Sequence, residues 1–205
     1  MTTHHFDETQ LEIKLGQVSW QHRVAFAASC AERLMPAYVA FSKRSGRGDP
    51  AALRGMLTQL WDDLAGNRLD DGELRSKIDA CMALIPQEDD APWLMEQAAA
   101  EDAGAAVAYA LRCRQSGQAK EATWAARRTY EALDHYVINR ENIDTTKPGA
   151  EERVLGHPLV QRELARQRRD LDEILCVGDT EVQEVAARLR DRAVTEGTNV
   201  FGGTS

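Results

Sequence analysis

The amino-acid sequence predicts an all-α fold: a single-domain bundle of about seven or eight helices. Alanine and leucine outnumber valine, isoleucine and threonine, which strands favour, and only 6% of the residues are aromatic. Apolar residues recur along most of the chain at the 3.6-residue spacing of a helix face. The 205 residues are 43% hydrophobic and 28% charged, as in globular domains. A chain of this length can bury roughly 70% of its unfolded surface in one core.

The first long helix is expected to begin at Trp20, with Ser19 as its N-cap. Its buried face would consist of Val24, Ala27, Ala28, Ala31 and Leu34. Pro36 has no backbone N–H, so we expect either a kink at Met35–Pro36 or a second helix from Pro36 to about Arg44.

The segment 46–50 is typical of a turn between helices, because Gly46 can end one helix, Asp49 can cap the next and Pro50 suits its first position. Further helices are expected at about 50–65, 72–84, 93–117, 118–141, 158–176 and 180–195. The alanine-rich helix 93–117, preceded by an acidic linker, is expected to be the central one. The predicted organisation is a lead-in of 1–17, a helical domain of 18–196 and a flexible tail of 197–205.

The overall charge argues against a nucleic-acid partner. The sequence has 25 lysines and arginines against 33 aspartates and glutamates, a net charge of −8, which would repel the phosphate backbone. No apolar stretch is long enough to span a membrane, and the amino terminus lacks the features of a secretory signal. Four widely spaced cysteines are expected to be buried or half-buried free thiols, which favours a cytoplasmic protein.

No catalytic or cofactor-binding motif is found, so we expect no cofactor. HExxH, GxSxG, a Walker loop and a complete dinucleotide-binding glycine motif are all absent. Glu131 and His135 are i, i+4 neighbours that could share a metal ion, but an exposed pair is the favoured interpretation, and no metal site is predicted.

Four polar residues are the candidate ligand-binding positions, because they lie on helix faces that should be buried: His22, Glu32, Arg33 and Asp102. Glu32 and Arg33 could form a half-buried pair or could face a ligand. Asp102, among alanines, needs a partner such as Arg33 or Arg112. His22 is more typical of a helix-end histidine than of a catalytic base. For all four the structural interpretation is favoured.

The helix 158–176 has a basic face, which could be either structural or a binding site. Arg162, Arg166, Arg168 and Arg169 are followed by acidic residues at helical spacing. This pattern favours a solvated face with i, i+4 ion pairs over an anion site.

Several segments together resemble one bacterial family. They are Trp20-Gln21-His22, Cys30-Ala31-Glu32-Arg33, Pro36-x-Tyr38 with Phe41, Gly46-x-Gly48-Asp49, Leu60-Trp61, Ile85-Pro86, Asp102-Ala103, the run 157–171 and Glu196-Gly197-Thr198-Asn199. The family is the domain of unknown function 416, and the resemblance covers most of the chain. It implies a helical, cytoplasmic bacterial protein with no assigned activity, and it supplies no catalytic residues.

Three hypotheses about function follow. The leading one is a non-enzymatic helical protein that acts through association with itself, as a homodimer, or with an unidentified protein partner. The second is a small-ligand-binding protein or enzyme with a pocket near Glu32, Arg33 and Asp102. The third is an acidic inhibitor or immunity-type protein, which would need a contiguous acidic surface.

Overall fold

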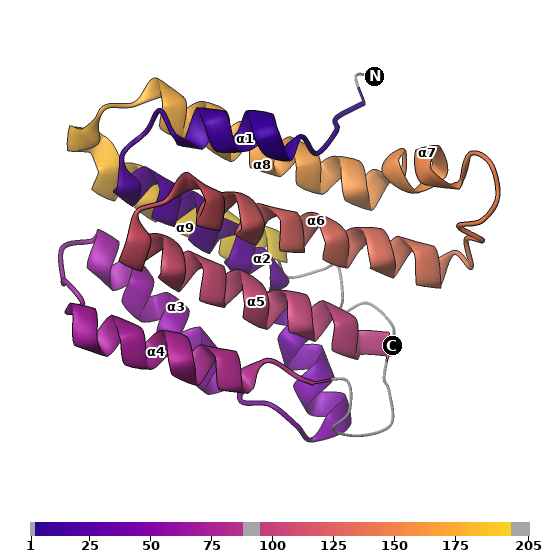
Figure 1. The fold of residues 1–205 in the computed structure, drawn as a ribbon, viewed down its shortest axis with the longest axis horizontal. Helices are drawn as coiled ribbons and strands as arrows, with labels where there is room; N and C mark the ends of the chain where they lie inside the picture. The colour runs from indigo at the N-terminus through magenta and orange to yellow at the C-terminus, as the bar shows by residue number, and fades with distance from the viewer. Residues whose placement is uncertain (1–2, 88–94, 198–205) are drawn as a thin grey trace.

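The computed structural model describes residues 3–87 and 95–197 and confirms the all-α architecture (Figure 1). Within these residues there are helices and no strands. The helices are α1 (Glu8–Leu15), α2 (Trp20–Ser45), α3 (Pro50–Leu64), α4 (Asp71–Leu84), α5 (Met95–Ser116), α6 (Ala119–Arg140), α7 (Ala150–Leu155), α8 (Pro158–Cys176), the 3-10 helix η2 (Asp179–Glu181) and α9 (Val182–Gly197). No helix in these ranges has both the length and the apolar character needed to cross a bilayer.

Helix α2 is the centre of the bundle. It packs against α3, α5, α6, α8 and α9, while α4 covers α5 and α1 covers α6. Figure 1 shows α5 and α6 side by side, with α3 and α4 below them and α1 and α8 above. The expectation that the alanine-rich helix is central is therefore wrong. Its small residues instead allow close packing in the layer around α2, and a Cβ at Gly104 would lie 2.9 Å from the Ile85 side chain.

Pro36 does not divide α2, which runs unbroken over 26 residues. The expected alternative of two separate helices is therefore wrong. Met35, Ala37 and Tyr38 around the proline are all buried, so tertiary packing outweighs the lost backbone hydrogen bond. The Tyr38 hydroxyl also donates to the Leu84 carbonyl at 2.7 Å, which ties α2 to the end of α4.

The turn after α2 forms as predicted. Gly46 ends the helix in the left-handed conformation, with φ of +69°. The Asp49 carboxylate then accepts from the Ala52 N–H at 2.9 Å and caps α3. Ser19 stands at the N-cap position of α2, but its side chain makes no capping bond and contacts His22 instead.

Two short helices lie outside the segments predicted to be helical. Helix α1 lies in the lead-in and buries Leu11 and Leu15 against the bundle. Helix α7 follows the loop after α6, and its Val154 joins a small second core between α6 and α8. The acidic linker, the expected helix start near Trp93 and nearly all of the predicted tail 197–205 lie outside the described residues.

Candidate functional site

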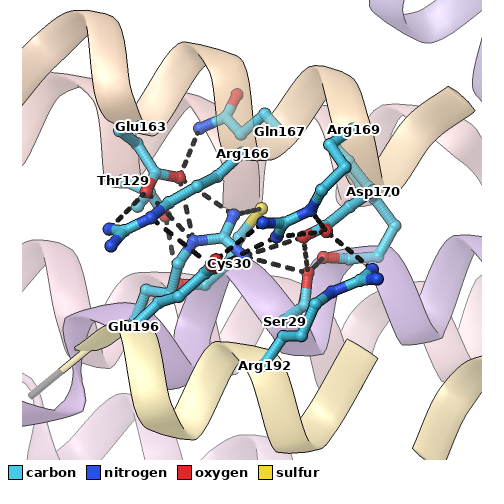
Figure 2. Close-up of polar contacts among 12 residues, drawn as sticks. Ser29, Cys30, Thr129, Glu163, Arg166, Gln167, Arg169, Asp170, Arg192 and Glu196 are labelled. Carbon is cyan, nitrogen blue, oxygen red and sulfur yellow. Dashed lines mark hydrogen bonds and ion pairs between the residues drawn. The ribbon is translucent and has the colours of Figure 1, made fainter. Parts of the chain in front are cut away.

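Arg33 lies at the centre of a buried ion cluster that joins α2 to α8. Figure 2 shows this cluster, with Glu163 and Asp170 of α8 among its members. Arg33 is only 3% exposed. Its Nε donates to both Glu163 carboxylate oxygens, at 3.1 and 3.0 Å, and its Nη2 donates to Oε1 at 2.9 Å. Its Nη1 donates to Asp170 Oδ2 at 2.9 Å. One buried cation is thus held by two buried carboxylates.

Arginines at the edge of the cluster connect it to α9. Arg169 and Arg192 each donate to the second oxygen of Asp170, at 2.8 and 3.1 Å. Arg169 also donates to Glu196 on α9 at 2.6 Å. The last turn of α9 packs closely on α2, because a Cβ at Gly197 would lie 3.1 Å from the Arg33 Cα. The cluster therefore holds three helices together.

Neutral polar groups add further hydrogen bonds to the cluster. The Ser29 hydroxyl donates to the Phe26 carbonyl at 2.8 Å and lies 3.3 Å from Asp170. The Gln167 amide nitrogen donates to Glu163 and to the Ala126 carbonyl, both at 3.1 Å. Buried carboxylates with several donors each are typical of a structural network.

The protonation states of the cluster suit this structural role. Burial opposes the charge of Arg33, but Glu163, with Cys30 and Asp170, outweighs it and raises the pKa of the guanidinium above its ordinary value. Burial raises the pKa of the Cys30 thiol to about 12, so it stays neutral. Neither group changes its charge near neutral pH, as an acid–base catalyst would.

Glu32 faces a different part of the bundle from Arg33, and the two do not pair with each other. Its carboxylate accepts from the Trp61 indole N–H at 3.1 Å and forms an ion pair with Arg54 on α3. The predicted pair is replaced by a link between α2 and α3, in which Trp61 is buried in the core.

Asp102 lies between α5 and α6, away from the Arg33 cluster. Its partner is Arg128, whose Nη1 lies 3.3 Å from Oδ1, so the expected pairing with Arg33 or Arg112 is wrong. The same Arg128 nitrogen also donates to Glu131 at 3.2 Å. Burial, only partly offset by Arg128, raises the pKa of Asp102 to about 6.

His22 lies at the start of α2 with its side chain buried. Its Nδ1 is 3.0 Å from the Ser19 hydroxyl and 3.7 Å from the Asp179 carboxylate, whereas its buried Nε2 has no hydrogen-bond partner in the described part of the chain. Both neighbours approach the same ring nitrogen, so these residues are not arranged as a catalytic triad. Burial lowers the pKa of His22, and Asp179 opposes this effect only in part.

The remaining candidate groups do not form a reactive centre within the described ranges. Glu131 pairs with Arg127 and Arg128, while His135 is exposed. No group of three or more potential metal ligands occurs among the described residues. Cys30, Cys81 and Cys113 are buried free thiols, as predicted. Cys176 is also a free thiol, but it is exposed, so the expectation that it is buried or half-buried is wrong.

The basic face of α8 divides into two parts. Arg168 makes the expected i, i+4 pair with Asp172, at 3.7 Å. Arg166 and Arg169 instead turn to Glu196 on α9, so part of the face is an interhelical contact and not a solvated surface.

Glu163, Asp170 and Gln167, which hold Arg33 in the cluster, are not among the residues that the sequence predicted for a site. The spacing does contain a signal for them. Together with the buried Val160 and Ile174, these three residues recur every three or four positions along one face of α8. The many arginines of this helix instead favoured an interpretation of α8 as a solvated face.

Comparison with known proteins places the chain in a family. The model of a family described as a protein of unknown function (DUF416) matches residues 10–202. The fold is similar to the crystal structure of a DUF416 family protein from Shewanella baltica OS155, with a TM-score of 0.78 and 19% identity over 92% of this chain and 96% of that one. No curated protein matches the chain. The family resemblance of the sequence is therefore confirmed, and the chain belongs to the DUF416 family of proteins of unknown function.

Proposed function

We propose that the protein acts by association with a second copy of itself and not by catalysis. The observation that carries the proposal is Ile13 on α1, which is 53% exposed, the largest exposure among the large apolar side chains of the described residues. It borders an open hollow shared by α1 and the first residue of α6, lined also by Glu12, Gly16 and Ala119. Exposed apolar surface of this kind is typical of protein interaction sites.

Two charges of opposite sign, each next in sequence to a residue of the hollow, favour a second copy as the partner. Glu12 lies next to Ile13, and Lys120 follows Ala119 on α6, where its ammonium lies 4.7 Å from the centre of the Trp124 ring. Neither charge has an ion-pair partner among the described residues. A twofold axis places the same patch on both subunits. Glu12 of each copy could therefore meet Lys120 of the other around an apolar centre.

Other observations support a non-enzymatic, cytoplasmic role. Glu32, Arg33 and Asp102 each pair with a different residue. Their side chains therefore do not converge on a shared ligand pocket. Buried free thiols suit a reducing compartment. Arginines and carboxylates alternate along α6, α8 and α9, which does not favour a contiguous acidic surface for an inhibitor.

Light scattering after size-exclusion chromatography tests the proposal. The expected result is a dimer that Ile13→Glu converts to a monomer. Met82→Glu is the matched control, because Met82 on α4 is 49% exposed but far from this patch. Glu12→Lys and Lys120→Glu should each weaken the dimer, and the double variant should restore it. A monomeric wild-type protein, or a dimer unchanged by Ile13→Glu, would contradict the proposal.

A further inference from the structure

A cleft of about 250 Å³ lies between the N-terminal residues, α1 and α8. Its apolar wall includes Phe6, Leu11, Leu164 and Leu171. Its volume corresponds to roughly eight water molecules at about 30 Å³ each. A ligand with a similar number of non-hydrogen atoms would fill it.

The side of the cleft formed by the N-terminal residues is preformed. The His4 N–H donates to Gln161 Oε1 at 2.8 Å, and Gln161 Nε2 donates back to the His4 carbonyl at 2.9 Å. The Phe6 ring stacks on Tyr130, with centroids 5.4 Å apart and planes within 3°. Fixing these residues before binding lowers the entropic cost of holding a ligand.

Gln167 presents a hydrogen-bond acceptor at the cleft. The residue lines the cleft but is only 5% exposed. The orientation of its amide is fixed by two acceptors, because Nε2 donates to Glu163 Oε1 and to the Ala126 carbonyl. In the flipped orientation the amide oxygen would face these two acceptor oxygens. Figure 2 shows the amide oxygen turned away from the ion cluster. No described residue donates to this oxygen, so it can accept from a ligand.

The charged groups that line the cleft are two cations and one carboxylate. Lys14 is half-buried, and none of the described carboxylates lies within ion-pair distance of its ammonium. Among the described residues, Arg168 has only the 3.7 Å contact with Asp172. The one carboxylate in the lining, Asp7, caps α1 by accepting from the Gln10 N–H at 2.9 Å. The rim thus offers two cations to an anionic group.

We infer that this cleft binds a small carboxylic acid that also carries a hydrogen-bond donor, such as a hydroxy acid or an amino acid. The carboxylate interacts with Lys14 and Arg168, the donor binds the Gln167 oxygen, and the short hydrocarbon part packs on the leucines. Gln167 is held in place by Glu163, so the buried Arg33 cluster positions one wall of the site. The cleft lies on the side of α1 that faces α8, whereas the proposed dimer surface lies on the side that faces the start of α6.

Titrations followed by NMR of labelled protein test the inference, with lactate, L-serine, propionate and inorganic phosphate as probes. Lactate and L-serine should shift the Gln167 side-chain amide and the Lys14 backbone signals in a saturable way. Propionate, which lacks the donor, should bind several-fold more weakly. Lys14→Met should weaken lactate binding by about tenfold or more, because it removes a charge-assisted contact. Lys43→Met, an exposed lysine on α2, should leave binding unchanged.

Three results would overturn the inference. The first is no saturable shift with either lactate or L-serine at millimolar concentration. The second is equal binding of phosphate and lactate, which would indicate non-specific attraction of anions. The third is unchanged lactate binding in a folded Lys14→Met protein. None of these depends on whether the chain forms a dimer.

Discussion

The Arg33 cluster and the Asp102–Arg128 pair are both buried ion sites, but they differ in how well their carboxylates are satisfied. Asp170 contacts Arg33, Arg169, Arg192 and Ser29. Asp102 has one contact at 3.3 Å with an arginine nitrogen that Glu131 shares. The first site joins three helices, whereas the second bears a desolvation cost that raises the pKa of its carboxyl to about 6. The number of donors, more than burial itself, decides whether a buried charge stabilises the fold.

The largest expected effect is the loss of Arg33. Arg33→Met leaves Glu163 and Asp170 buried without their central cation, so the free energy of unfolding should fall by about 3–5 kcal/mol. Urea unfolding measures the change. Arg168→Met, on the exposed face of α8, is the control and should cost less than about 1 kcal/mol. Similar losses for the two variants would show that the cluster has no special role.

Asp102→Asn should raise the free energy of unfolding, in contrast to Arg33→Met. The pKa of Asp102 is about 6 in the folded protein against an ordinary 3.8, so the native state binds more protons between these values. Wild-type stability should therefore fall as the pH rises through this range, whereas Asp102→Asn avoids the loss. The variant should be more stable by roughly 1–3 kcal/mol at about pH 8, with no difference below about pH 4.

Thermal unfolding across this pH range checks the prediction. Asp172→Asn, an exposed residue on α8, is the matched control and should show no such pH-dependent gain. A destabilised Asp102→Asn variant at about pH 8 would mean that the pair with Arg128 outweighs the desolvation cost.

The smallest effect is expected at the edge of the Arg33 cluster. Glu196→Gln weakens the ion pair with Arg169, which is partly exposed, and should cost about 1 kcal/mol. Burial opposes ionisation of Glu196, but its hydrogen bonds with Arg169 lower its pKa. This contribution is present above its ordinary pKa of 4.5 and is lost on acidification. The loss of stability caused by Glu196→Gln should therefore disappear in acid. An equal loss in acid would mean that the substitution acts through packing and not through the ion pair.

The sequence was sufficient for the fold but not for the partners of its buried charges. Helical periodicity located the long helices, and the position of Arg33 on an apolar face predicted a buried arginine. Its partner Glu163 lies 130 residues away in the sequence, and pairing across helices depends on their relative register, which one sequence does not determine. For the same reason Asp102 was assigned to the wrong arginine.

The most direct test of the structural role of the cluster is the stability of a charge-free version. The triple variant Arg33→Met, Glu163→Met, Asp170→Leu removes the central cation together with both carboxylates, and its urea unfolding is compared with that of Arg33→Met alone. If the network only holds helices together, the triple variant should recover most of the stability lost by the single variant and should keep its helical content. A triple variant as unstable as Arg33→Met would contradict the account.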